Sequence, residues 1–303
     1  MKKKAKKIIL YSVLAVVLLI VAFVGFLAHI GFEGRGPLLF LSYFESPVQL
    51  TAKQYEYTAI PFSVENQGEK IVGTMYVPQD NQIRRKVLIY SPGFSCPGTW
   101  LAGKAESLAA AGTATVTFDF RGGSHLSKSE GQTKRMTFAT EMSDLNRVID
   151  YVRSQQWADS TGIYLLGESF GGLVSALTAA QRKDIAGLIL WFPALHSGES
   201  ARNYFATTEA IPDSLQVGDM LTGKAFWQSL LALDVYREIS RYTGRVLIIH
   251  GTDDQQVSPD YSVSANRLYQ HSELVLLEGG DHGFGGNNAK SALKTVLHFV
   301  NDK

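Results

Sequence analysis

Cysteine is almost absent from this chain of 303 residues, which contains only Cys96. A disulfide within the chain is therefore impossible, and stability must come from a hydrophobic core. Hydrophobic residues make up 45% of the sequence, which is ample for such a core. Cys96 lies between Pro92 and Pro97, and this context predicts a small loop residue rather than a nucleophile.

The chain also lacks a marked excess of either charge, with 29 Lys and Arg against 28 Asp and Glu. Five of the lysines lie among the first seven residues, which leaves 24 basic residues against 28 acidic ones in the rest of the chain. Because that mildly acidic body offers no basic surface to a phosphate backbone, we predict no nucleic-acid partner.

Motifs for metals and dinucleotides are missing as well. No H-E-x-x-H segment and no paired C-x-x-C occurs, and the seven histidines are scattered. No G-x-G-x-x-G follows a strand-like segment. We therefore predict neither a metal ion nor any other cofactor.

One long hydrophobic run is present, from Ile8 to about Ile30, directly after the lysines. About 20 apolar residues suffice to cross a bilayer. The end of the run is a poor cleavage site, so an uncleaved anchor over residues 1–30 is favoured over a cleaved signal peptide or a buried helix. Because positive charge resists translocation, we expect a single pass of the cell membrane with the N-terminus in the cytoplasm and the body outside. Residues 31–54 are predicted to be a linker.

From Tyr55 onward strand-like and helix-like segments alternate, which is typical of a mostly parallel sheet with helices on both faces. Residues 55–303 are therefore predicted to form one α/β domain. The alternation breaks over residues 194–244, which are rich in aromatic side chains, so we expect an inserted cap there, over the carboxyl edge of the sheet. The eight predicted strands are Tyr55–Val64, Ile71–Val77, Lys86–Ser91, Thr113–Asp119, Gly162–Leu166, Ile185–Phe192, Arg245–His250 and Leu274–Glu278.

The segment Gly167-Glu168-Ser169-Phe170-Gly171 follows an apolar strand-like run and precedes an apolar helical one. A strand, a G-x-S-x-G motif and a helix in this order form a nucleophile elbow, a tight turn that exposes the serine hydroxyl. Ser169 is therefore predicted to be a catalytic nucleophile, with a purely structural glycine-rich turn as the alternative.

A serine nucleophile needs a histidine base, and the histidine needs an acidic partner that fixes its tautomer. Only one of the seven histidines, His282, follows a late strand in a loop that can reach the elbow, so His282 is the predicted base. Two neighbouring candidates for the acid, Asp253 and Asp254, follow the strand that ends at His250, and spacing alone does not separate them. An aspartate-rich turn that merely caps the next helix is the alternative.

An oxyanion hole in this arrangement takes one N–H from the residue after the nucleophile and one from the loop after the third strand. The first is the N–H of Phe170. The second loop is Ser91 to Gly98, in which Phe94 is the predicted donor.

These motifs resemble the α/β-hydrolase superfamily, and the second half of the chain is similar to the bacterial cinnamoyl (feruloyl) esterases. The resemblance rests on G-E-S-F-G-G around Ser169, on His250 to Pro259, and on the run from Tyr269 to His282. It implies the α/β-hydrolase fold, and it favours Asp254 as the acid.

The same resemblance suggests where substrate binds. Glu199 falls near the acidic residue that contacts the phenolic ring in those esterases, and Trp227 falls near their tyrosine. Together with the neighbouring aromatic Phe226, these residues are the candidate substrate contacts.

The sequence thus predicts a membrane-anchored serine hydrolase, and the resemblance implies a carboxylesterase that cleaves acyl esters, with aryl and cinnamoyl esters among the candidates, through an acyl-serine intermediate. A peptidase or an acyl transferase on the same fold stays open. So does a non-catalytic surface binding protein, which is a different class of function. The predicted partners are a small-molecule ester and, through the N-terminal helix, the membrane.

Overall fold

The computed structural model describes residues 46–302. The predicted membrane anchor and most of the predicted linker therefore lie outside the described residues. Within residues 46–302 no helix combines the length and the apolar character needed to cross a membrane.

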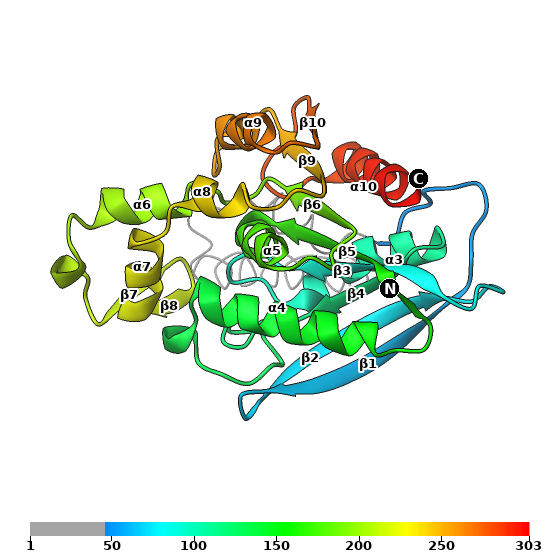
Figure 1. The fold of residues 1–303 in the computed structure, drawn as a ribbon, viewed down its shortest axis with the longest axis horizontal. Helices are drawn as coiled ribbons and strands as arrows, with labels where there is room; N and C mark the ends of the chain where they lie inside the picture. The colour runs from blue at the N-terminus through cyan, green and yellow to red at the C-terminus, as the bar shows by residue number, and fades with distance from the viewer. Residues whose placement is uncertain (1–45, 303) are drawn as a thin grey trace, which may run out of the picture.

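An eight-stranded sheet forms the centre of the molecule, in the order β1-β2-β4-β3-β5-β6-β9-β10 (Figure 1). The pairs β1–β2 and β2–β4 are antiparallel, and all other neighbours are parallel. The mostly parallel sheet predicted from the sequence is therefore confirmed. Its strands are β1 (Tyr57–Asn66), β2 (Glu69–Pro78), β3 (Arg85–Ser91), β4 (Ala114–Phe118), β5 (Ala158–Glu168), β6 (Gly187–Trp191), β9 (Arg245–Gly251) and β10 (Ser272–Leu277).

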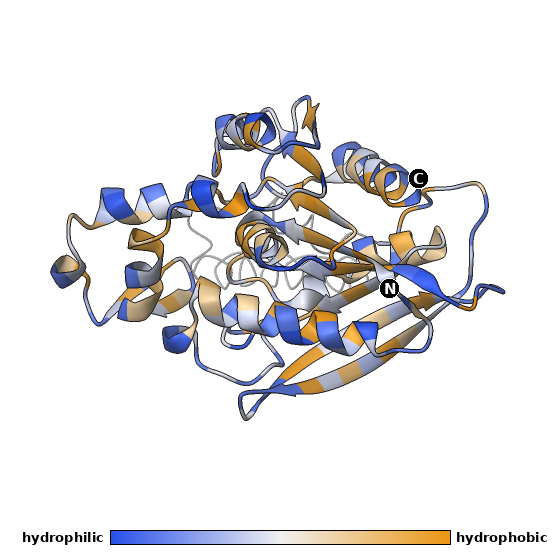
Figure 2. Ribbon diagram, in the orientation of Figure 1, coloured by the Kyte–Doolittle hydropathy of each residue, from blue (hydrophilic) through white to orange (hydrophobic). Residues whose placement is uncertain are grey.

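Helices cover both faces of this sheet. One hydrophobic cluster joins the sheet to α3 (Ala102–Ala110) and α10 (Gly286–Asn301), and a second joins it to α4 (Phe138–Arg153) and α5 (Ser169–Gln181). Figure 2 shows the hydrophobic residues concentrated in the strands and hydrophilic ones on the outer side of α4. That segregation follows from helical spacing, because the inward positions of α4 lie three or four residues apart: Met142, Leu145, Val148, Ile149 and Val152.

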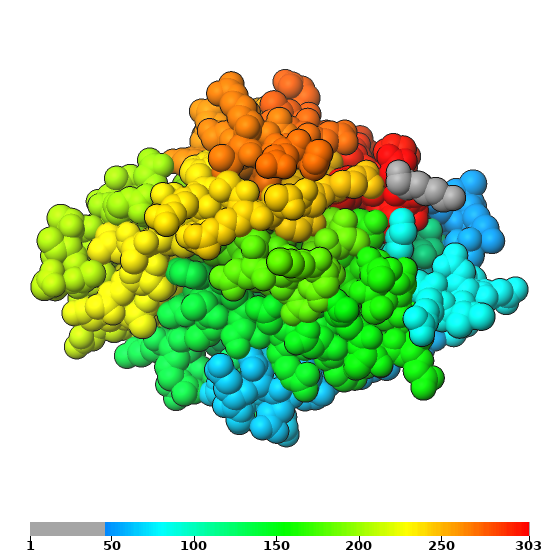
Figure 3. Space-filling model, in the orientation of Figure 1, coloured from blue at the N-terminus to red at the C-terminus, as the bar shows by residue number. Residues whose placement is uncertain are grey.

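The chain between β6 and β9 forms a separate lobe, the cap, at the end of the molecule opposite the C-terminus (Figures 1 and 3). Its apolar side chains belong to the same hydrophobic cluster as α4 and α5, so the cap is packed onto the body rather than loosely tethered. The sequence did not predict its short hairpin, β7–β8, because four-residue strands carry almost no periodic signal. The elements of the cap are α6 (Ser197–Tyr204), β7 (Ser214–Val217), β8 (Met220–Gly223), α7 (Lys224–Leu231) and α8 (Val235–Ile239).

The shorter helical elements complete the connections: α9 (Pro259–Leu268) joins β9 to β10, and three 3-10 turns occur at Gly98–Leu101, Thr133–Arg135 and Thr208–Ala210.

The parallel strands β3, β5, β6, β9 and β10 all run in the same direction. The loops that follow them therefore meet at one edge of the sheet, and these loops carry the predicted nucleophile, acid, base and oxyanion donors.

Candidate active site

Ser169 lies at the junction of β5 and α5, in a strained turn. Its φ is 51°, a left-handed conformation that non-glycine residues seldom adopt. The turn is so tight that a Cβ on Gly167 would lie 2.2 Å from the carbonyl oxygen of Gly171, and one on Gly171 would lie 2.2 Å from that of Pro92. Glycine is therefore required at both flanking positions, and the side chain of Ser169 is turned out of a buried segment towards the cavity described below.

His282 follows β10 and is held by Asp254. Its Nδ1 lies 2.7 Å from Oδ2 of Asp254, and both side chains are buried. An ionised carboxylate only accepts hydrogen bonds, so Nδ1 of His282 donates and Nε2 is left free of a proton. Phe192 packs against the ring, with centroids 4.5 Å apart, and fixes its plane. This is the orientation that a general base requires.

Four hydrogen bonds converge on the carboxylate of Asp254. Oδ1 accepts the backbone N–H groups of Gln256, at 2.8 Å, and Val257, at 2.9 Å. Oδ2 accepts from His282 and also from Nε2 of His250, at 3.1 Å. Burial alone would raise the pKa of Asp254, but the hydrogen bonds from His250 and His282, the attraction to the His282 ring when it is protonated and the Val257 N–H outweigh burial and hold the pKa well below its ordinary value. Asp254 is therefore ionised at neutral pH.

Asp253, the other candidate for the acid, points elsewhere. Its side chain is exposed and accepts a hydrogen bond from the hydroxyl of Thr252, at 3.1 Å. It makes no contact with His282 in the part of the chain that the structure describes. Two adjacent residues in a turn direct their side chains differently, and here only Asp254 is directed at the histidine.

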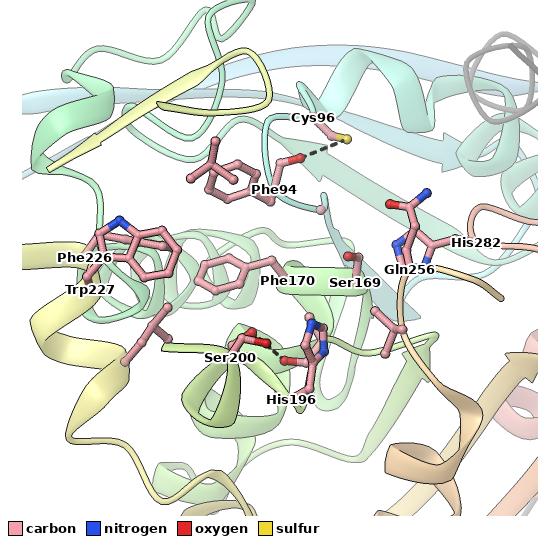
Figure 4. Close-up of a pocket in the computed structure, with 16 residues that line it drawn as sticks. Phe94, Cys96, Ser169, Phe170, His196, Ser200, Phe226, Trp227, Gln256 and His282 are labelled. Carbon is pink, nitrogen blue, oxygen red and sulfur yellow. Dashed lines mark hydrogen bonds between the residues drawn. The ribbon is translucent and has the colours of Figure 1, made fainter. Parts of the chain in front are cut away.

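Ser169 and His282 open onto a cavity of about 280 Å³ beneath the cap (Figure 4). An aromatic wall extends from the serine into the cap: Phe94 is 6.1 Å from Phe170 and 5.9 Å from Phe226, centroid to centroid, and Trp227 adjoins Phe226 at 5.4 Å. The structure thus places Phe226 and Trp227, two of the three predicted substrate contacts, on the cavity wall.

Glu199, the third predicted contact, is absent from the cavity lining. It lies in the first turn of α6 with an exposed side chain, and Oε2 accepts a hydrogen bond from the hydroxyl of Tyr261 at 3.1 Å. That prediction was wrong in position, because α6 turns this residue towards α9 instead of the cavity.

The two predicted oxyanion donors flank Ser169. Phe170 directly follows it, and the loop of Phe94 approaches closely enough that a Cβ on Gly93 would lie 3.3 Å from Cβ of Ser169. Among residues 46–302 neither the Phe94 nor the Phe170 N–H has an acceptor in the protein. Both are thus open to a negatively charged oxygen beside Ser169.

Two further histidines lie near the site. His250, which lies four residues before Asp254, is fully buried, and its Nδ1 bonds to the hydroxyl of Ser262 at 2.7 Å. His196 lines the cavity, and burial lowers its pKa, with a further lowering by His282. The position of His250, at the end of a strand and beside the acid loop, is visible in the sequence. His196 gave no local signal, because its place under the cap is a tertiary property.

Comparison with known proteins agrees with this geometry. Residues 100–303 match the prolyl oligopeptidase family, described as Peptidase S9. The chain belongs to that family. It is a serine hydrolase of the α/β-hydrolase fold, similar to the bacterial cinnamoyl esterases, as the sequence motifs predicted.

Solved structures share the fold. Est1E from Butyrivibrio proteoclasticus with ferulic acid bound superimposes with a TM-score of 0.71 at 26% identity, covering 78% of this chain and 97% of Est1E. The α/β hydrolase GrgF from a Penicillium species superimposes with a TM-score of 0.66 at 18% identity, covering 81% and 98%. The latter likeness concerns the fold alone.

Sequence relatives extend over a smaller part of the chain. A protein of Escherichia coli, described as an uncharacterized 31.7 kDa protein in the traX–finO intergenic region, is 34% identical over 122 residues. The match covers 40% of this chain and 41% of that protein. The chain thus spans about two fifths of the length of the curated relatives that it matches.

Proposed function

We propose that this serine hydrolase is a carboxylesterase, anchored in the membrane, that cleaves small acyl esters through an acyl-serine intermediate. One observation carries the proposal: Ser169, on its strained elbow, opens onto the same cavity as His282, whose Nδ1 is bound to Asp254. A nucleophile, a base and an orienting acid in that relation are the requirements for acyl transfer through serine.

The proposed steps are those of acyl transfer through a serine nucleophile. Nε2 of His282 takes the hydroxyl proton of Ser169 as Oγ attacks the ester carbonyl. The carbonyl oxygen becomes an oxyanion, which the N–H groups of Phe94 and Phe170 stabilise. As the intermediate collapses, the C–O bond to the alcohol breaks and His282 returns the proton to the leaving alkoxide. Water then attacks the acyl-serine with His282 again as base. The bond from the acyl carbon to Oγ breaks, the carboxylic acid leaves, and His282 returns the proton to Oγ of Ser169. Asp254 stabilises the imidazolium at each step.

The cavity favours a flat or apolar acyl group. Phe94, Phe170, Phe226 and Trp227 form a continuous aromatic wall, and each buried methylene of a ligand contributes about 0.8 kcal/mol. The bound ferulic acid of Est1E supports the extension to aryl and cinnamoyl acyl groups. Esters with aliphatic acyl chains and cinnamoyl esters are therefore the substrates to test first.

The membrane anchor belongs to the same proposal. Residues 1–30 join a lysine cluster to a hydrophobic run long enough to cross a bilayer. The proposed topology puts the lysines in the cytoplasm and the catalytic domain outside the cell. Protease added to intact cells should digest residues 55–303; a body that resists the protease until the cells are broken would contradict the topology.

A fluorophosphonate probe and a panel of p-nitrophenyl esters test the chemistry on the full chain in detergent. We expect covalent labelling and turnover in the wild type, and neither in Ser169→Ala. Labelling and turnover that are equal in the two proteins would reject the proposal. A wild type without either would instead indicate a non-catalytic binding protein.

A second candidate, a peptidase, is favoured by the family to which residues 100–303 belong. The same three side chains can cleave an amide, so fold and triad do not separate the two. Aminoacyl-anilides assayed beside the p-nitrophenyl esters decide between them. Faster turnover of the anilides would make the protein a peptidase, and transfer of the acyl group to an added alcohol in preference to water would make it an acyl transferase.

A further inference from the structure

Two histidines, rather than one, bond to the proposed catalytic carboxylate. Oδ2 of Asp254 lies 2.7 Å from Nδ1 of His282 and 3.1 Å from Nε2 of His250. His282 lines the cavity, whereas His250 is fully buried and is not part of the cavity lining. His250 is therefore a buried titratable group on a catalytic oxygen that the proposed reaction leaves without a role.

The surroundings of His250 fix which of its two nitrogens carries the proton. Besides Asp254, Nε2 faces the backbone oxygen of Val257 at 3.0 Å. An ionised carboxylate and a carbonyl oxygen only accept hydrogen bonds, so Nε2 carries the proton and donates to both. Nδ1, on the other side of the ring, faces the hydroxyl of Ser262 at 2.7 Å, and a hydroxyl can donate or accept. One N–H of His250 therefore holds the carboxylate and the loop that carries it.

The two histidines share the negative charge of one oxygen. The N–H of His250 directs the positive end of its dipole at Oδ2 and offsets part of the charge that would stabilise an imidazolium on His282. Burial is the largest influence on the pKa of Asp254 and raises it, and the hydrogen bond from His250 comes next and lowers it. If that bond were lost while Asp254 stayed on His282, the imidazolium would be favoured. A base that is already protonated cannot accept the proton of Ser169.

The other charged groups around this pair are the same whether or not His250 is present. The neighbouring strand β6 carries no charged residue. The charged residues of α9, of β10 and of the loops after β9 and β10, apart from Asp254 itself, have exposed side chains: Asp253, Asp260, Arg267, Glu273, Glu278 and Asp281. His196 also faces His282, and burial, followed by the charge of His282, lowers the pKa of His196. A substitution of His250 leaves all of these groups in place.

We propose that His250 is a positioning residue that holds Oδ2 of Asp254 and, by sharing the charge of that oxygen with His282, keeps His282 free of a proton and ready to act as the base at neutral pH. The proposal rests on the proposed function, with Ser169 as nucleophile and His282 as base. It makes a buried residue of β9 set the pH range in which the enzyme works.

Two amide substitutions of His250 test the proposal because they differ in which ring nitrogen they replace. The amide of His250→Gln reaches the place of Nε2 and can donate to Asp254, whereas that of the shorter His250→Asn reaches the place of Nδ1 and gives Asp254 no donor. The assay is kcat/KM for p-nitrophenyl acetate from pH 5 to pH 9, because its acid limb reports protonation of the base in the free enzyme. In His250→Asn we expect the acid limb to move to higher pH by about 0.5–1 unit, which lowers kcat/KM on the limb about 3–10-fold, while the plateau stays within about threefold of the wild type. His250→Gln should keep the limb of the wild type.

Ser262→Ala is the matched control for a loss of stability alone. It removes the hydrogen bond on the far side of the His250 ring, but Nε2 keeps both of its acceptors, Asp254 and the Val257 carbonyl. We expect a melting temperature that is lower by a few degrees and an unchanged acid limb. If His250→Asn fails to fold, His250→Leu takes its place, because leucine fills much of the space of the ring and also gives Asp254 no donor.

The direction of the shift separates this role from a purely structural one. A damaged loop that broke the bond between Asp254 and His282 would remove the charge that favours the imidazolium. The limb would then move to lower pH, and the plateau would fall by at least about 10², as in Asp254→Asn. That result, an unmoved limb in His250→Asn, or an equal shift in Ser262→Ala or His250→Gln would overturn the proposal.

Failure of the proposed function gives a different result. Turnover that survives in Ser169→Ala would show that the nucleophile is elsewhere. The protonation of His282 can then be followed without substrate, by NMR of isotope-labelled histidine, with its signal identified by its absence in His282→Gln; His250→Asn should move this titration to higher pH by the same amount. Turnover that depends on Ser169, with an unmoved limb in His250→Asn, would reject only the role of His250.

Discussion

Replacing Asp254 by asparagine tests the chemistry of the site most directly. Oδ1 faces two backbone N–H groups, those of Gln256 and Val257, which cannot turn away. An asparagine must therefore keep its oxygen on that side and present its NH₂ group to His282 and His250. To avoid two opposed donors, His282 must accept at Nδ1 and carry its proton on Nε2. That is the atom that has to take the proton of the serine nucleophile.

The expected loss follows from the wrong tautomer. In a serine protease the corresponding substitution lowers kcat by about 10⁴, which is about 5.5 kcal/mol of transition-state stabilisation. We expect a loss of this size, and of at least about 10², in Asp254→Asn. Folding should suffer less, because the asparagine oxygen keeps the bonds from the Gln256 and Val257 N–H groups, and His250 keeps its bond from Nε2 to the Val257 carbonyl at 3.0 Å. The melting temperature should fall by no more than about 5 °C.

The assay is kcat/KM for p-nitrophenyl acetate across pH 6–9, with Asp253→Asn as the matched control. The side chain of Asp253 is exposed and bonds to Thr252, and the backbone N–H, which donates to Gly280, is kept in the variant. Its replacement should therefore leave kcat within about twofold of the wild type. Equal losses in the two variants, or an Asp254→Asn enzyme within about tenfold of the wild type, would refute the assignment of the acid.

Ser169→Ala should abolish turnover to below about one part in a thousand, while the melting temperature changes by only a few degrees; higher residual activity contradicts the nucleophile. Trp227→Ala should destabilise the protein by about 3–5 kcal/mol, because the side chain is 6% exposed, and should raise KM for octanoate and ferulate esters more than for acetate. A uniform loss across esters would reject Trp227 as a specificity residue. Deletion of residues 1–30 should give a soluble, active domain, and an inactive fragment would mean that the following segment is part of the fold. Burial raises the pKa of Glu141 well above 4.5, with a further contribution from Asp144, so folding disfavours its charged form and stability is lost as pH rises above about 4.5. Glu141→Gln should therefore raise the melting temperature more at pH 8 than at pH 5, and equal shifts would exclude this cause.

Much of the fold could be predicted because its signals are local. The inner strands of the sheet are buried on both faces, so β4 and β6 consist of continuous runs of buried residues that stand out in the sequence. The nucleophile is equally visible in the sequence, because its turn requires glycine on both sides. A Cβ on Gly167 or on Gly171 would lie 2.2 Å from a backbone carbonyl oxygen. By contrast the hairpin β7–β8 has strands of four residues, and its pairing depends on the body against which it docks.

The candidate site was only partly accessible from the sequence. Spacing left Asp253 and Asp254 equivalent as candidates for the acid, and the resemblance favoured Asp254. In the structure Asp254 is hydrogen-bonded to His282, because the loop after β9 turns only that carboxylate inward. The resemblance also suggested Glu199 as a substrate contact. In the structure Glu199 accepts a hydrogen bond from Tyr261 instead, because similarity along the chain does not fix the direction in which α6 turns its side chains.

The sequence by itself determined the type of sheet, the elbow at Ser169 and the loop of the base. The elbow and the base loop are local patterns, and the type of sheet follows from the order of strand-like and helix-like segments along the chain. Only the tertiary structure decided which groups meet between distant loops. It brought His250 onto the carboxylate of Asp254, placed His196 under the cap, and joined Ser95 to Asp219 across 124 residues. Such contacts arise from the packing of the cap on the sheet edge, a property of the whole fold that no local pattern records.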